Sequence, residues 1–439
     1  MKGVFFTARF EITEILLTKV SVLVLSLFRS LVFWSCEFVS NFGFRLPRRS
    51  GAAKAGASDL GPAARRPASL GACFIFFLLN FTPPVGASDF RSVTGPCDFV
   101  FPRDHGAHPD FRTEWWYYTG NVGTPSGKRY GFQLTFFRTQ IAEPGSEKTW
   151  PKNPSAWRTK DIFLAHTALS DLEKKRFHLD ERVARSGAGL AGVTQDQEDT
   201  RVFIGNWSAL IQFDHHRLNA SANEFSLDLL CKAAKPLAAH GQEGYSIKGK
   251  RRESASCYYS ATRLEAEGSI TLRGTAVPVR GTAWMDHEFS SAPLEDDLEG
   301  WDWFSLQLED RTELMIYLLR QKAGPNSASS SGTFVKASGE AIRLSNSDFQ
   351  VEVLERWKSP RSGATYPARW RIRVTPLNLE LSIVPALPDQ ELITEKSTRV
   401  TYWEGSVMVS GRSGQNPVSG VGYVEMTGYA KPFNLAPTP

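Results

Sequence analysis

The chain has 439 residues, of which 41% are hydrophobic and 22% are charged. These proportions are typical of a globular protein with two or three domains and exclude a largely disordered chain. Residues 1–87 hold ten basic and four acidic side chains, which leaves 41 basic and 42 acidic ones in the remainder. The net charge of the chain outside residues 1–87 is therefore close to zero. This excludes a basic groove, so no nucleic-acid partner is expected.

Residues 1–87 have the features of a leader rather than of a folded domain. Two arginines precede the apolar run 73–79, and small residues follow at 85–88. This order predicts a secretory signal peptide that ends near Ala87, and therefore a periplasmic or secreted protein. We expect residues 1–54 to precede the true start of the chain. The alternative is a genuine N-terminal anchor, and association with a membrane surface is left open.

From residue 98 onward, short runs alternate between apolar and polar residues and are separated by turns rich in glycine, serine and proline. Such alternation, with many aromatic and β-branched residues, predicts half-buried β-strands and an all-β sandwich or barrel. The clearest examples are 131–137, 269–272, 313–318, 370–374 and 379–383.

A tryptophan-led strand, a turn and an apolar strand that ends in arginine occur twice. The first copy runs from Trp116 to Arg138 and the second from Trp303 to Arg320. Two copies predict two related antiparallel β-barrel domains in tandem. We expect the domains at 98–292 and 293–435, with the break within 290–299. The alternative is that aromatic hairpins of this kind occur in any β-protein.

The densest group of reactive side chains lies at 281–289. If this segment is a strand, Trp284, Asp286 and Glu288 share one face and His287 points to the other. Two neighbouring carboxylates tend to share a proton, and a neutral carboxylic acid beside an aromatic surface suits general acid catalysis. Tryptophan faces could steady a developing cation, so the combination suits protonation of an alkene followed by capture of water. The alternative is that the motif caps a turn and holds the two domains in register.

A second cluster lies at 105–118, where alternation places Glu114 beside Trp116 on one face. His105 and His108, together with His166 and His287, could gather around a metal ion. Nothing in their spacing demands a metal, so none is expected. The residues expected to shape the cavity or to orient ligand and water are Glu114, Trp116, Tyr117, His166, Trp301 and Trp303.

The cysteines and the missing motifs narrow the chemistry further. Outside the leader, Cys97, Cys231 and Cys257 permit one disulfide and leave one thiol, and the spacing does not say which. No Cys-x-x-Cys, Gly-x-Ser-x-Gly, His-Glu-x-x-His or phosphate-loop motif is present. A serine hydrolase or a nucleotide-dependent enzyme is therefore not expected.

At these residues the sequence resembles the carotenoid 1,2-hydratases (hydroxyneurosporene synthases) and their secreted relatives of the AttH type, also labelled predicted secreted hydrolases. The resemblance covers about 98–435 and implies two lipocalin-like domains, with catalysis by an acid that follows an aromatic residue two positions earlier. The matching residues are Asp286 and Trp284. The hydratases also have an upstream His-x-Trp pair, whereas 257–259 here contains no histidine, which favours the broader secreted branch. The motifs that carry the resemblance are 112–118, 165–171, 281–289, 300–304, 402–405 and 422–429.

The resulting hypothesis is an exported hydratase- or hydrolase-like enzyme that acts by acid catalysis, without a cofactor, on an apolar isoprenoid or polyene-type molecule. Asp286 is the expected proton donor or acceptor. One alternative is a non-catalytic lipocalin-like carrier of a lipid or pigment, and another is a metal-dependent hydrolase. The oligomeric state is not predicted. The residues expected at the catalytic centre are Trp284, Asp286, His287 and Glu288.

Overall fold

The computed structural model describes residues 90–433. The predictions for the leader, namely the signal peptide, the true start and the anchor, fall outside these residues. Within the described part, no helix has the length and hydrophobicity needed to cross a membrane. That part contains four short 3-10 turns and no α-helix, as an all-β fold requires. The turns are η1 (Arg103–His105), η2 (Ser146–Thr149), η3 (Gly187–Gly189) and η4 (Thr375–Leu377).

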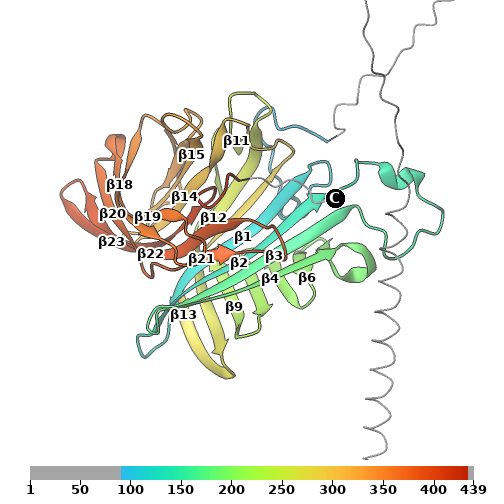
Figure 1. The fold of residues 1–439 in the computed structure, drawn as a ribbon, viewed down its shortest axis with the longest axis horizontal. Coiled ribbons are helices and arrows are strands. Elements are labelled where there is room, and N and C mark those ends of the chain that lie inside the picture. The colour runs from blue at the N-terminus through green and yellow to red at the C-terminus, as the bar shows by residue number, and fades with distance from the viewer. Residues whose placement is uncertain (1–89, 434–439) are drawn as a thin grey trace, which may run out of the picture. The chain divides into compact units, whose positions relative to one another are not determined.

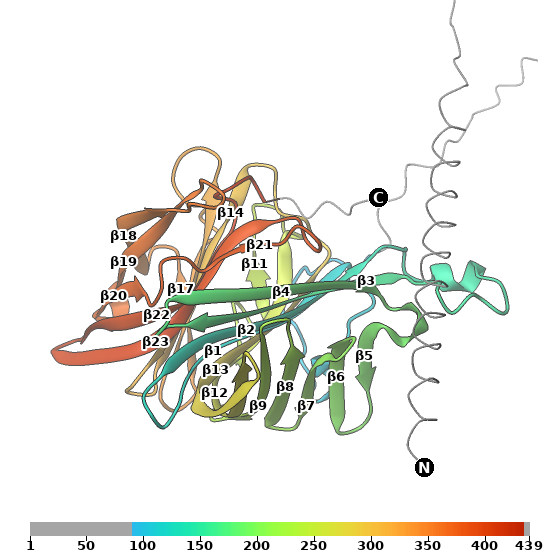
Figure 2. The ribbon, with the colours of Figure 1, turned by 60° about the horizontal axis from the view of Figure 1, so that its bottom comes forward.

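The first sheet has 13 antiparallel strands in the order β4-β3-β2-β1-β13-β12-β9-β8-β7-β6-β5, with β10 and β11 paired to β12 (Figure 1). The sheet curls into a nearly closed barrel (Figure 2). Near its two edges, β6 contacts both β3 and β4. The strands are β1 (Thr113–Gly123), β2 (Arg129–Gln140), β3 (Asp161–Asp171), β4 (Arg176–Arg185), β5 (Ala191–Gln195), β6 (Asp199–Ile204), β7 (Trp207–Gln212), β8 (His215–Ser221), β9 (Phe225–Ala233), β10 (Ala238–Ala239), β11 (Tyr245–Ile247), β12 (Ala255–Leu272) and β13 (Thr275–Ser290).

The second sheet has ten antiparallel strands in the order β17-β16-β15-β14-β23-β22-β20-β19-β18, with β21 paired to β22. It forms a half-barrel, and it begins eight residues after the last strand of the first sheet ends. The strands are β14 (Leu298–Leu308), β15 (Glu313–Gln321), β16 (Ser331–Val335), β17 (Ala341–Ser345), β18 (Phe349–Lys358), β19 (Thr365–Val374), β20 (Leu379–Pro385), β21 (Glu391–Ile393), β22 (Thr401–Ser413) and β23 (Asn416–Met426). The predicted all-β fold of two tandem lipocalin-like antiparallel β-barrels is confirmed, with the first barrel nearly closed and the second a half-barrel.

Each sheet encloses a core of its own, and a third apolar cluster lies where the two sheets face each other. Alternation along the strands decides which residue goes where, because successive side chains point to opposite faces. On β13, Met285 belongs to the core of the first sheet, whereas Trp284 belongs to the cluster between the sheets. A glycine in β2 helps the sheets to approach, because a Cβ at Gly131 would lie only 2.7 Å from the Cβ of Ser406 in β22.

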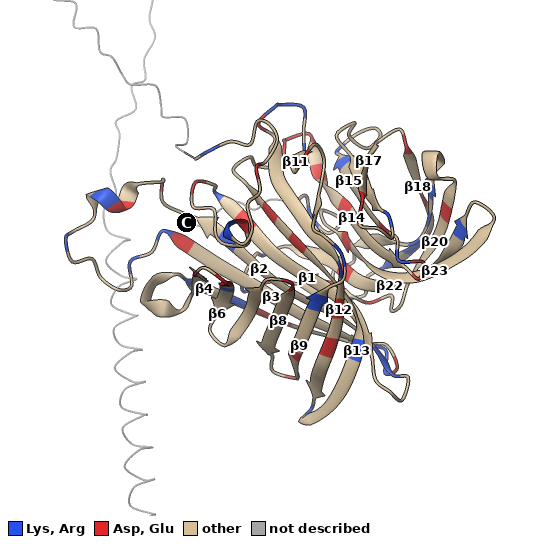
Figure 3. Ribbon diagram, turned by 180° about the vertical axis from the view of Figure 1, so that it is seen from behind, with Lys and Arg blue, Asp and Glu red and all other residues tan. Residues whose placement is uncertain are grey.

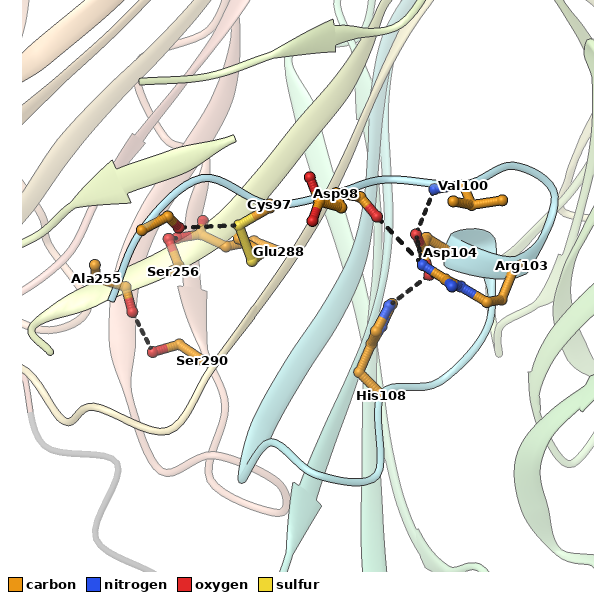
Figure 4. Close-up of a disulfide and its surroundings, with 12 residues drawn as sticks. Cys97, Asp98, Val100, Arg103, Asp104, His108, Ala255, Ser256, Glu288 and Ser290 are labelled. Atoms are coloured by element: carbon orange, nitrogen blue, oxygen red, sulfur yellow. Dashed lines mark hydrogen bonds and ion pairs between the residues drawn. A yellow bond between two sulfur atoms is a disulfide. The ribbon is translucent and has the colours of Figure 1, made fainter. Parts of the chain in front are cut away.

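A disulfide ties the N-terminal segment to the first sheet. Cys97 bonds to Cys257 near the start of β12, and Cys231 is a buried free thiol. The sequence had left this choice open. The bond lies beside Glu288, which accepts a hydrogen bond from Ser256 (Figure 4). The disulfide therefore fixes the chain just before Tyr258 and Ser260, the two β12 residues that bond to Asp286 of β13.

Candidate functional site

Polar and aromatic side chains from both sheets meet in the cluster between the sheets. The first sheet contributes the outer faces of β1, β12 and β13, and the second contributes those of β14, β15, β22 and β23. Figure 3 shows acidic positions on strands of both sheets in this region. The apolar and aromatic members are Tyr117, Tyr258, Trp284, Leu298, Trp303, Met315, Tyr317, Leu319 and Tyr423, with Trp115, Leu294 and Trp301 partly buried at the edge.

Asp286 is 4% exposed and accepts three hydrogen bonds. The Trp284 indole N–H donates to Oδ1 at 2.6 Å, the Ser260 hydroxyl donates to the same oxygen, and the Tyr258 hydroxyl donates to Oδ2 at 2.9 Å. Burial raises the pKa of Asp286 to about 7 and the charge of Glu288 adds to this, although the three hydrogen bonds act in the opposite direction. The carboxyl can therefore hold or release a proton near neutral pH.

Two further carboxyl groups come from the second sheet. The Tyr117 hydroxyl donates to Glu404, which also accepts a 3.2 Å hydrogen bond from the Gln133 amide. The Trp301 indole N–H donates to Glu425 at 2.9 Å. Burial raises the pKa of Glu404 well above its usual range and that of Glu425 to about 7, and the charge of Asp286 contributes to both increases. Three carboxyl groups that influence one another thus face the space between the sheets.

Glu288 has a different environment, since a cation lies beside it. The Lys248 ammonium group is 3.1 Å from a Glu288 oxygen, and it lies over the rings of Tyr258 at 4.9 Å and Tyr317 at 4.0 Å. Although burial acts to lower it, the charge of Glu288 raises the pKa of Lys248. Glu288 is therefore part of an ion pair and is less suited than Asp286 to donating a proton.

A histidine extends the hydrogen bonds of Asp286 into the second sheet. His240 Nε2 is 2.6 Å from the Ser260 hydroxyl, and Nδ1 is 2.9 Å from the Thr333 hydroxyl. Burial lowers the pKa of His240 to about 3, with a further contribution from Lys248. A neutral ring can donate at Nε2 to Ser260 and accept at Nδ1 from Thr333, so Ser260 stays oriented toward Asp286.

The raised pKa of Glu425 predicts a pH-dependent stability. The folded state holds this proton more tightly than the unfolded chain, so the contribution of Glu425 to stability falls as the pH rises from 4.5 to about 7 and then levels off. Glu425→Gln removes this titrating group. We therefore expect the free energy of unfolding of the variant, minus that of the natural chain, to be larger at pH 8 than at pH 5.5. Urea unfolding at both pH values measures this difference.

Glu295→Gln is the matched control. Although partial burial opposes it, hydrogen bonds from the Lys250 and Arg251 amides and the Ser254 hydroxyl lower the pKa of Glu295 to about 2. This group is ionised throughout the range, so the control should lose the same stability at both pH values. The prediction would be contradicted if Glu425→Gln also differed from the natural chain by the same free energy of unfolding at both pH values.

The structure brings together only some of the residues predicted for the site. Trp284, Asp286, Glu288, Trp303 and Tyr117 meet between the sheets, and Trp301 lies at the edge. His166 lies on the same interface but bonds elsewhere, to the Tyr402 hydroxyl at 2.7 Å and to the Ser397 hydroxyl at 2.8 Å.

Glu114, Trp116 and His287 do not lie at this site, which corrects the expectation that Glu114 and Trp116 line the same cavity as Trp284. They point into the first sheet, because they occupy the alternate positions of β1 and β13. Glu114 is also not a neutral carboxylic acid that could donate a proton. Although burial opposes it, hydrogen bonds from His108 and His287 and the charge of Arg138 hold the pKa of Glu114 well below its usual range.

Two surface hollows of the described residues lie away from Asp286. One, of about 340 Å³, lies beside Asp196–Asp199, and the other, of about 730 Å³, lies along β9, β12 and β13. The Asp286 side chain itself is buried, and neither hollow reaches it. The cluster between the sheets is least covered at its edge, where Trp115, Leu294 and Trp301 are only partly buried.

Comparison with known proteins identifies the family. The AttH-like family model matches residues 92–429, which is most of the chain. The chain belongs to the AttH-like family. This AttH-like protein is 34% identical to a solved AttH-assigned structure from Nitrosomonas europaea, with a TM-score of 0.67, and the match covers 77% of this chain and 99% of that one.

A second solved structure shows the same fold at lower identity. Kievitone hydratase from Nectria haematococca is 17% identical to the AttH-like chain, with a TM-score of 0.59 and coverage of 78% of this chain and 97% of that one. None of the curated proteins compared with the chain matches it. The resemblance to the AttH-type relatives, which the sequence motifs indicated, is confirmed.

The sequence interpretation missed Glu404 and Glu425 as site residues. Both stand in motifs that carry the family resemblance, at 402–405 and 422–429, but they lie more than 100 residues after Asp286. It also missed Tyr258 and Ser260, although the alternation of β12 places them on one face. A useful signal would have been that a glutamate is unusual directly after a large apolar residue in a strand pattern, as Glu404 is after Trp403 and Glu425 is after Val424.

Proposed function

We propose that this protein is an enzyme that adds water to, or removes it from, a carbon–carbon double bond of a largely apolar small molecule by acid catalysis. The observation that carries the proposal is the meeting of Asp286, Glu404 and Glu425 between the two sheets among indole and phenol rings. Buried carboxyl groups with raised pKa values suit general acid and general base roles near neutral pH.

The proposed step is balanced by two carboxyl groups. Protonated Asp286 gives its proton to one alkene carbon, and the resulting cation is stabilised by the faces of Trp284 and Trp303. The oxygen of a water molecule bonds to the other carbon, and ionised Glu425 takes the proton that this water loses. Exchange with solvent then returns each carboxyl group to its starting protonation state.

The proposed substrate is of isoprenoid or polyene type. The cluster supplies mostly indole and phenol rings, and the carboxyl groups carry few formal charges to bind a charged ligand. The solved relative described as a hydratase has the same fold, which supports this reaction class. The disulfide between Cys97 and Cys257 supports the proposed export, because disulfides persist in oxidising compartments.

The test is incubation of the full chain with isoprenoid alkenes and their tertiary alcohols in water enriched in ¹⁸O, followed by mass spectrometry. We expect at least one alkene to gain one labelled water, or its alcohol to exchange oxygen, at a rate proportional to enzyme concentration. Unchanged masses for every compound, together with an unmodified lipid bound to protein from its own host, would instead establish the carrier.

A further inference from the structure

A second polar cluster lies on the opposite face of β13 from Asp286, inside the first sheet. Two imidazoles converge on one carboxylate oxygen. His108 Nδ1 is 2.6 Å from Glu114 Oε1, and His287 Nε2 is 2.9 Å from the same oxygen. The three ligand atoms lie within 4.8 Å of one another. Glu114 and His287 are fully buried, whereas the His108 side chain keeps 16% of its exposure.

The surroundings fix the orientation of Glu114 so that one oxygen remains for the histidines. Its other oxygen, Oε2, accepts hydrogen bonds from Arg138 Nε at 2.9 Å and from the His108 backbone N–H at 3.0 Å. Arg138 itself is anchored by Asp161 at 3.0 Å. Oε1 therefore faces the two imidazole nitrogens without competition from the arginine.

The outer nitrogen of each imidazole also has an oxygen partner. His108 Nε2 is 3.4 Å from Asp104 Oδ1 (Figure 4). The His108 ring stacks on the Phe289 ring, with 3.6 Å between their centroids. His287 Nδ1 is 2.9 Å from the Tyr259 hydroxyl. Histidines that bind metal ions almost always have such a partner on the second nitrogen, which sets the ring orientation and leaves the first nitrogen as a ligand.

We propose that His108, Glu114 and His287 form a three-ligand site for a divalent transition-metal ion of the zinc type. Two imidazole nitrogens and one carboxylate oxygen are a ligand set that such ions bind tetrahedrally with a fourth position open. With metal–ligand bonds of about 2.0–2.2 Å, neighbouring ligand atoms lie roughly 3.3 Å apart. The 2.6 Å between His108 and Glu114 needs to open by about 0.7 Å, which His108 can provide because it lies in the loop between η1 and β1. The 2.9 Å between His287 and Glu114 needs to open by only about 0.4 Å.

The local charge favours a cation. The cluster and its immediate partners contain three carboxylates and two guanidinium groups. One negative charge therefore remains when the histidines are neutral. The charged groups are Asp104, Glu114, Asp161, Arg103 and Arg138. A bound ion would hold the segment before β1 against β13. This site is separate from the proposed function, since it lies on the other side of β13 and neither depends on the other.

The experiment uses the full chain, stripped of metal with a chelator and dialysed at pH 7.5. Zn²⁺ is then added, and bound metal is measured by elemental analysis and calorimetry. Co²⁺ serves as a second probe, with its visible absorption reporting coordination. We expect one ion per chain, a higher melting temperature in Zn²⁺ and a tetrahedral Co²⁺ spectrum. His108→Ala should weaken Zn²⁺ binding by more than about 100-fold, because it removes a direct ligand.

His178→Ala is the matched control. His178 is also buried and bonds to a carboxylate, Glu224 at 2.6 Å, but among residues 90–433 it belongs to no group of three or more possible metal ligands. This variant should bind Zn²⁺ like the natural chain. The proposal is overturned if the natural chain binds no ion at micromolar Zn²⁺, if His108→Ala binds as tightly, or if the control loses binding to the same extent. The melting temperature of each metal-free variant distinguishes lost binding from lost folding.

Discussion

Replacing Asp286 by asparagine is expected to lower turnover by about 10²–10⁴-fold, because the amide cannot donate or accept the proton that general acid–base catalysis transfers. The same change should leave the fold nearly intact. Asparagine has the shape of the protonated acid, and its carbonyl oxygen can still accept the hydrogen bonds from Trp284 and Ser260. Its amide N–H can donate to the Tyr258 hydroxyl oxygen, which lies 2.9 Å from Oδ2.

Turnover and melting temperature measured on the same preparations separate a catalytic role from a structural one. Asp302→Asn is the matched control, since Asp302 is a buried aspartate on β14, the next strand along the chain and the first of the second sheet. It points to the opposite face and bonds to Arg320 and to the Tyr429 hydroxyl at 3.0 Å. This control should lower stability and retain turnover where folded. If Asp286→Asn instead lowered the melting temperature as strongly and left turnover per folded molecule unchanged, the motif would be a structural junction between the sheets.

The sequence predicted the two faces of β13 but not what lies opposite each of them. Alternation alone separates Trp284 and Asp286 from His287, and the structure has them on opposite faces. The partners of Asp286 cannot be found in this way. Tyr258 comes from a neighbouring strand, and Glu404 and Glu425 come from a sheet that begins after β13 ends. Their proximity is set by pairing register and sheet packing, which local patterns do not encode.

The internal repeat illustrates the same limit. Trp116 and Trp303 are not equivalent in side-chain direction. Trp116 points into the core of the first sheet, whereas Trp303 points out of the second sheet into the cluster between the sheets. Trp115 and Tyr117 are residues of β1 that share the outward direction. A shift of one residue reverses every side chain of a strand, so similar letters can be aligned one position out of register.

A second large effect is expected at the buried ion cluster that joins the sheets, where Glu313→Gln should lower the free energy of unfolding by about 3–5 kcal/mol. Glu313 begins β15 in the second sheet and is fully buried. It binds two cations of the first sheet, with Lys235 at 2.7 Å and Arg263 on its other oxygen. A neutral amide accepts from only one of them and presents N–H groups to the other, which leaves uncompensated positive charge in the interior.

The matched control is Glu340→Gln, which removes the same charge from an exposed pair. Lys336 and Glu340 are 2.9 Å apart, and their side chains keep 45% and 61% of their exposure. Exposed pairs contribute little, so this variant should change stability by less than about 1 kcal/mol. Urea unfolding at pH 7, followed by tryptophan fluorescence and circular dichroism, measures both. Because Glu313 links the sheets, its loss should also separate their unfolding into two transitions, and a single transition with a loss as small as the control's would show that apolar packing alone holds them together.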